Sequence, residues 1–155
     1  MKIEVVGPIS EKNALFDMTV GSLTEVTIDL SKMTFVNSIG VKNWMTWLYK
    51  VPTSSRVYLY HCPLVMVNQA STVAGFLSEY AFIMSFSAPY LCEKCGAEKY
   101  ITLERGKDFE YALKGAPSWF KAEVEIPCHK CSAALEPDYI VAKTFSFLNR
   151  SETRS

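Results

Sequence analysis

The chain has 155 residues, of which 49% are hydrophobic and 21% are charged, and its formal net charge is zero. This length suits one ordinary domain, or one domain with a small additional module, and the composition is that of a globular protein. The absence of excess positive charge argues against a general nucleic-acid-binding protein. No apolar run reaches the roughly 20 residues of a membrane span, and no signal-peptide pattern follows Met1. We therefore expect a cytoplasmic protein that does not contact a membrane.

The first 90 residues alternate between strand-like and helix-like patterns. Period-two alternation and short apolar runs predict strands at 3–6, 25–30, 57–60 and 82–86. Residues 11–18 fit either a short helix or a strand. Helices are predicted at 40–49, ending before Pro52, and after Pro63, which suits the first helical position. This order of elements predicts an α/β layer in which helices pack on a sheet.

One segment of this layer carries a recognisable motif. It contains Ile28-Asp29-Leu30-Ser31, followed by Phe35-Val36-Asn37-Ser38-Ile39-Gly40-Val41. The order and spacing resemble the signature segment of STAS domains, the family that includes bacterial anti-sigma factor antagonists. The resemblance covers about residues 1–90. It implies a mixed sheet with helices packed on it, and a non-catalytic bacterial role in signal transduction through protein–protein interaction.

Two positions of the motif depart from the family pattern. The Asp of the family is Asn37 here. The residue that a partner kinase phosphorylates in the classical members corresponds to Ile39, which cannot accept phosphate. Ser38 is the remaining candidate phosphosite, although we predict that its hydroxyl caps the following helix instead. The resemblance therefore implies the fold more directly than it implies a phosphorylation switch.

The helix after the motif is the predicted partner-binding element. A helical wheel centres its core face between Trp44 and Met45. The predicted partner-binding residues are Asn37, Ser38, Ile39, Asn43, Trp47 and Lys50. We expect an exposed Ile39 beside a partly exposed Trp47, a pair suited to protein–protein contact; alternatively, Trp47 packs against the ribbon or the C-terminal segment of the same chain. By resemblance, the partner is a signalling protein such as an anti-sigma factor or a serine or histidine kinase, and a homo-oligomer is compatible with the sequence.

Four of the five cysteines form two C-x₂-C pairs. The pairs are Cys92 with Cys95 and Cys128 with Cys131. Four thiolates complete the tetrahedral shell of Zn²⁺, whereas a catalytic zinc ion normally keeps one position open. The sequence thus predicts one structural Zn²⁺ in a ribbon module at 91–135. Strands at 99–103 and 120–126 are expected to pair and to bring the two cysteine pairs together.

Two alternatives remain for the ribbon module. The first is nucleic-acid binding, but the segment from Cys92 to Cys131 has as many acidic as basic residues, and zinc-bound thiolates add further negative charge. The second is a redox or metal-responsive accessory protein that uses the cysteine pairs. Trp119 and Phe120 form either an exposed aromatic tip or, as we favour, a small core under the ribbon hairpin.

The rest of the chain gives no reason to expect an enzyme. Cys62 lies near a predicted helix N-terminus, yet no acid partner accompanies it, and we interpret it as a buried, inert thiol. Phosphate-loop and hydrolase motifs are absent from the sequence. Residues 136–155 are predicted to form a helix at 137–148, with a strand at 139–147 as the alternative, and then a frayed polar tail at 150–155.

Overall fold

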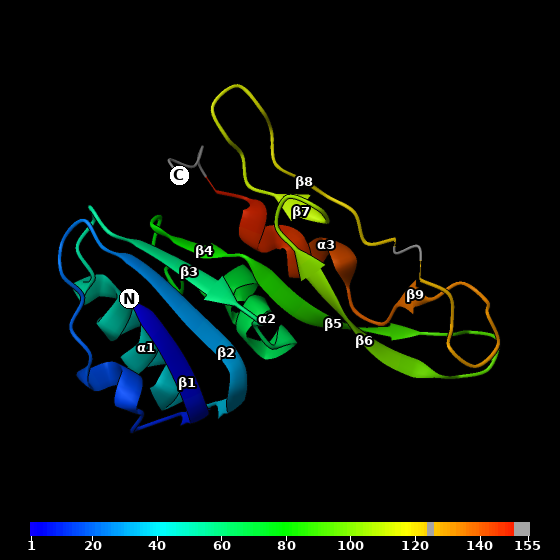
Figure 1. Cartoon of the computed structure of the whole chain (residues 1–155), viewed down its shortest axis with the longest axis horizontal. Helices are drawn as coiled ribbons and strands as arrows, with labels where there is room; N and C mark the ends of the chain where they lie inside the picture. The colour runs from blue at the N-terminus through cyan, green and yellow to red at the C-terminus, as the bar shows by residue number, and fades with distance from the viewer. Residues whose placement is uncertain (124–125, 151–155) are drawn as a thin grey trace.

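The computed structural model describes residues 1–123 and 126–150 and contains a four-stranded and a three-stranded sheet (Figure 1). The four-stranded sheet consists, in order, of β1 (Lys2–Ile9), β2 (Glu25–Val36), β3 (Arg56–Tyr60) and β4 (Ala81–Ile83). Its strands are parallel in every pairing. The α/β class predicted from the sequence is confirmed, but the prediction of a mixed sheet is wrong for this layer.

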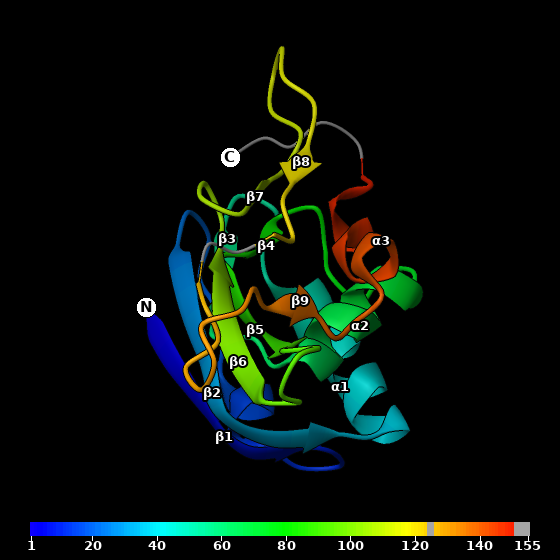
Figure 2. The ribbon, with the colours of Figure 1, turned by 90° about the vertical axis from the view of Figure 1, so that its right-hand side faces the viewer.

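The connections between these strands lie on one face of the sheet (Figures 1 and 2). They contain the 3-10 helix η1 (Ala14–Asp17), α1 (Ser38–Lys50) and α2 (Leu64–Thr72). Since neighbouring parallel strands follow one another in sequence and such crossovers are right-handed, all connections are directed to the same side. Of the two readings of residues 11–18, the short helix is the one observed. None of the described helices is long and apolar enough to cross a membrane.

The predicted strand at 82–86 is divided into two strands at Met84. The N–H of Met84 donates to the carbonyl of Leu59 on β3 at 2.7 Å, while its own carbonyl accepts from the N–H of Arg105 at 2.9 Å. The N–H of Met84 therefore pairs with the four-stranded sheet, whereas its carbonyl pairs with the chain directly after β6 (Glu98–Glu104). The prediction of one continuous strand is wrong because the chain passes from the parallel layer to the second sheet at this residue.

The second sheet is antiparallel and includes part of the segment predicted to form a ribbon. Its order is β6 (Glu98–Glu104), β5 (Ser85–Leu91) and β9 (Glu136–Pro137), and a separate pair consists of β7 (Phe109–Glu110) and β8 (Trp119–Phe120). The predicted pairing of 99–103 with 120–126 is wrong, because β6 pairs with β5 in a hairpin and Phe120 pairs with Phe109. Residues 124 and 125 of the predicted strand lie outside the described residues.

A helical turn and a 3-10 turn follow β9, namely α3 (Val141–Thr144) and η2 (Phe145–Leu148). The hydroxyl of Ser71 on α2 donates to the carbonyl of Thr144 at 2.7 Å, which docks this segment on α2. The predicted C-terminal helix is confirmed for this part. The strand alternative at 139–147 is not observed. The predicted frayed tail is wrong at Arg150, whose guanidinium donates to the carbonyls of Ser78 and Ala81 at 3.3 and 3.0 Å, and its other residues, 151–155, lie outside the described residues.

An aromatic cluster joins the two sheets, because Phe82 on β4 packs on Tyr111, Tyr111 packs on Phe147, and Phe147 packs on Phe86 of β5. The ring centroid of Phe86 lies 5.6 Å from those of Phe109 and Phe145. Phe120 stacks on Phe145 at 4.6 Å, although 46% of its surface is exposed, and Trp119 is also exposed. The predicted small core is thus correct for one face of Phe120 and wrong for Trp119. The buried residues of both sheets form one hydrophobic cluster, and β5 extends across the predicted boundary at residue 90.

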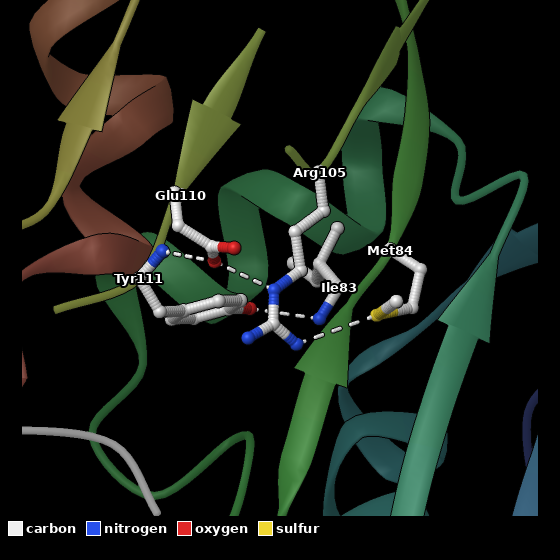
Figure 3. A network of polar contacts seen from close by, with 5 residues as sticks. All are labelled: Ile83, Met84, Arg105, Glu110 and Tyr111. Atoms are coloured by element: carbon white, nitrogen blue, oxygen red, sulfur yellow. Dashed lines mark hydrogen bonds and ion pairs between the residues drawn. The ribbon is translucent and has the colours of Figure 1, made fainter. Parts of the chain in front are cut away.

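A polar network lies at the junction of the sheets (Figure 3). Arg105 Nε donates to Glu110 Oε2 at 2.6 Å, and the guanidinium also contacts the sulfur of Met84 at 3.6 Å. The hydroxyl of Tyr111 accepts from the N–H of Ile83 at 2.7 Å. These contacts pair the polar groups that become buried where β4 ends and β5 begins.

Candidate functional site

Two tight turns present the four cysteines of the C-x₂-C pairs. The first turn connects β5 to β6 and carries Cys92 and Cys95. The N–H of Cys92 donates to the carbonyl of Ala97 at 2.8 Å, and the N–H of Gly96 donates to the carbonyl of Cys92 at 2.7 Å. Gly96 has a φ of +76°, a conformation that glycine adopts without steric cost.

The second turn has the same hydrogen-bond pattern. The N–H of Cys128 donates to the carbonyl of Ala133 at 2.7 Å, and the N–H of Ser132 donates to the carbonyl of Cys128 at 2.9 Å. Ser132 occupies the position of Gly96 and also has a positive φ, +62°. The two turns are therefore equivalent in backbone structure, and each presents a pair of thiols on one side.

Strand β9 brings the second turn against the first. It follows Cys131 in the chain and pairs with β5 at Tyr90 and Leu91, directly before Cys92. The hydroxyls of Tyr90 and Tyr139 lie 2.8 Å apart and hold the segment after β9 in place. The cysteine pairs meet through this short antiparallel contact instead of the ribbon pairing predicted from the sequence.

The four thiols have the spacing of a metal site. The sulfur atoms of Cys92 and Cys131 lie 3.4 Å apart, those of Cys95 and Cys128 lie 3.6 Å apart, and all four lie within 4.8 Å of one another. In a tetrahedral zinc–thiolate site with Zn–S bonds of about 2.3 Å, neighbouring sulfur atoms are about 3.8 Å apart. The donor chemistry and the geometry fit, and these four cysteines could hold one metal ion.

The turns also favour thiolates at some of these positions. Backbone N–H groups of Lys130 and Cys131 lower the pKa of the Cys128 thiol to about 6. For Cys95, the backbone N–H of Ala97 is the largest single influence and lowers the pKa, yet the contacts with the other three thiols and burial together outweigh it and raise the pKa to about 11. Without a cation, the crowded sulfur atoms cannot all carry negative charge. A divalent ion offsets this repulsion and displaces the remaining protons.

Helix α1 begins differently from the prediction. Asn37, and not Ser38, is the N-cap: its Oδ1 accepts from the N–H of Gly40 at 2.7 Å. The backbone of Asn37 is extended, with φ −108° and ψ 176°, whereas Ser38 is already the first helical residue. The prediction of a Ser38 cap is wrong because the chain enters the helix one residue earlier. Ser38 is exposed, and its role as a phosphosite stays a prediction.

The expectation of a partly exposed Trp47 is also wrong. The side chain is 4% exposed, and its Nε1 donates to the carbonyl of Met18 at 2.9 Å. The buried face of α1 consists of Gly40, Trp44, Trp47 and Leu48. At 100° per residue, this face is rotated by about 65° from the predicted one. Trp47 therefore packs within the chain, toward η1, and is removed from the surface available to a partner.

The other predicted partner-binding residues differ in accessibility. Ile39 is 48% exposed and Lys50 is exposed, as expected. Asn43 is half-buried, and its amide donates to the carbonyl of Ser10 at 3.1 Å. Asn37 uses its side chain to cap the helix. Of the predicted residues, Ser38, Ile39 and Lys50 thus remain the accessible ones.

A hollow of about 580 Å³ lies along the exposed face of α1. It is lined by Ser38, Val41, Lys42, Met45, Thr46, Tyr49 and Lys50. Met45, at the centre of the predicted core face, instead lines this hollow. Lys42 and Tyr49 are absent from the predicted partner-binding residues, although Tyr49 is 80% exposed. A helical wheel whose core face is centred on Trp44 and Trp47 places Lys42 and Tyr49 on the exposed side of the helix.

Cys62 has no access to solvent. It is fully buried, and burial raises the pKa of its thiol far above the ordinary value. The interpretation as a buried thiol is confirmed.

Comparisons with protein-family models, with curated proteins and with solved structures find no match for this chain. The STAS resemblance therefore rests on the segment from Ile28 to Val41. The structure itself defines an α/β protein with a parallel sheet and a cluster of four cysteines that could bind a metal ion.

Proposed function

We propose that this protein is a non-catalytic regulatory module that binds a bacterial signalling protein through the exposed face of α1. The observation that carries the proposal is the hollow along α1. It lies on the helix that directly follows the STAS-like segment, where the resemblance implies that partners dock. By the same resemblance, the partner is an anti-sigma factor or a related serine or histidine kinase.

The chemistry of the hollow restricts the partner surface. Val41 and Met45 are half-buried and supply apolar contact area, and Tyr49 adds an exposed ring. Lys42 and Lys50 are exposed along the same face, and α1 contains no acidic residue. Charge complementarity favours a partner segment with an apolar ridge and flanking acidic side chains.

The position of Ile39 makes this binding independent of phosphorylation at the usual acceptor site. Ser38 is the exposed hydroxyl in the capping segment and also lines the hollow. A phosphate there would add negative charge beside Lys42 and oppose an acidic partner. Phosphorylation of Ser38 would thus weaken the complex.

For the cysteine cluster, we propose one structural Zn²⁺. Four thiolates close the coordination shell and leave no position for a substrate. The ion would hold the turn at Cys92 against the turn at Cys128, in addition to the short β9 pairing and the contact between Tyr90 and Tyr139. The zinc site thus supports the second sheet, and partner binding takes place on α1.

Site-specific photocrosslinking tests the proposed function. A photoreactive amino acid replaces Thr46 in the hollow or, as the control, Tyr100, which is 67% exposed on β6. In the native cell, we expect a signalling kinase or anti-sigma factor to crosslink from position 46 and not from position 100. Tyr49→Ala should reduce this crosslink. Identical products from both positions, or products that contain no signalling protein, would contradict the proposal.

A further inference from the structure

Strand β1 is a free edge of the four-stranded sheet. Within the described residues it pairs with β2 on one side and with no strand on the other (Figure 1). An edge strand presents unpaired N–H and C=O groups that can pair with another chain. The part of β1 whose backbone groups are open determines which chain could pair with it.

The end of β1 is blocked by its own chain. The side-chain amide of Asn13 donates to the carbonyls of Val6 and Pro8, at 3.2 and 3.0 Å. Pro8 has no N–H, and Gly7 has a φ of +77°, which interrupts the regular strand. The open edge is therefore confined to the first half of the strand.

Lys2 and Glu4 direct their backbone groups to this open edge. The carbonyl of Met1 accepts from the N–H of Thr27 on β2 at 2.9 Å. Since alternate residues of a parallel strand pair with the same neighbour, the backbone of Ile3 also faces β2. The intervening residues, Lys2 and Glu4, then have N–H and C=O groups that point away from the sheet.

We propose that two copies of this chain pair antiparallel through β1, with Lys2 opposite Glu4 of the second copy. In a two-fold arrangement, residues with outward backbone groups must face one another. Placing Lys2 opposite Lys2, or Glu4 opposite Glu4, sets like charges against each other. The remaining register, centred on Ile3, forms two pairs of unlike charge and joins the two parallel layers into one continuous sheet.

Side-chain directions agree with this register. Lys2 and Glu4 are exposed on the face of the sheet that carries no helix, and Glu4 also contacts Lys32 at 3.1 Å. Ile3, at the centre of the register, is buried on the opposite face within its own chain. The edge is distinct from the α1 hollow and from the cysteines, so this proposal does not depend on the proposed function.

A pair of charge-reversal variants tests the register. Analytical ultracentrifugation of the full chain should show a concentration-dependent dimer. Lys2→Glu alone gives facing acids, and Glu4→Lys alone gives facing bases, so each variant should weaken the dimer at least about tenfold. An equimolar mixture of the two variants restores unlike charges at both pairs and should dimerise. Circular dichroism checks the fold of both variants, whose changed side chains are exposed.

Lys99→Glu, on the exposed part of β6, is the matched control and should dimerise like the wild type. A wild-type chain that stays monomeric throughout overturns the proposal. Single variants that dimerise as strongly as the wild type overturn it as well, and so does a mixture that stays monomeric.

Discussion

The four-stranded layer and the cysteine-bearing sheet are stabilised in different ways. In the layer, buried aliphatic residues alternate along the strands and meet one face of α1, as Ile28 and Trp44 illustrate. In the second sheet, β9 has only two residues, and its position depends on aromatic contacts and on the cysteine turns. Regular periodicity stabilises the first region, whereas a few contacts between residues distant in sequence stabilise the second.

The aromatic cluster is where the two regions depend on each other most. Phe86→Ala removes a fully buried ring that contacts Phe109 and Phe145. We expect a loss of about 4 kcal/mol in the free energy of unfolding, measured by urea denaturation. Phe120→Ala, which removes an exposed ring stacked on the same cluster, should cost about 1 kcal/mol. Equal effects of the two substitutions would contradict the larger contribution expected of the buried Phe86 ring.

The contact between α1 and β1 tests the parallel layer alone. A Cβ added at Gly40 would lie 1.7 Å from the carbonyl oxygen of Ile9, so Gly40→Ala must push the helix away from the strand. We expect a loss of about 3 kcal/mol in thermal or urea denaturation.

Gly21→Ala is the control for this prediction. The nearest atom to its added Cβ is the Thr24 hydroxyl at 3.6 Å, an ordinary contact, so stability should change by less than about 0.5 kcal/mol. A Gly40→Ala variant as stable as the control would contradict the close packing of α1 on β1.

The prediction from sequence succeeded where a local pattern determines the structure. Alternation located the first half of β2, and the C-x₂-C spacing identified the four cysteines that lie together. It failed where the outcome depends on distant residues. Nothing local to β9 indicates that it pairs with β5, and the burial of Trp47 depends on the carbonyl of Met18.

The start of α1 allows a smaller test of the same point. Asn37→Ala removes the side chain that accepts from the N–H of Gly40 and should cost about 1 kcal/mol. Ser38→Ala, one residue later, removes an exposed hydroxyl and should be nearly neutral. Chemical denaturation of both variants compares the two positions, and a larger loss for Ser38→Ala would restore the assignment made from the sequence.

The smallest effect concerns Cys62 and appears only at high pH. Burial raises the pKa of this thiol above its ordinary value of 9.0. The stability associated with the neutral thiol is complete below that value and is lost as pH rises above it, because only the unfolded chain then ionises freely. Relative to a Cys62→Ala variant, the wild type should lose stability above pH 9. Parallel pH profiles would contradict the buried position.

Hydrogen exchange with and without zinc tests the central difference between the two regions most directly. The full chain is measured with a chelator and again with one equivalent of Zn²⁺, and native mass spectrometry records the bound metal. We predict one ion per chain and slower exchange in the turns at Cys92–Ala97 and Cys128–Ala133, with little change in β1 to β4. A chain that binds no zinc, or zinc-independent exchange in those turns, would contradict the proposed stabilisation of the second sheet by a metal ion.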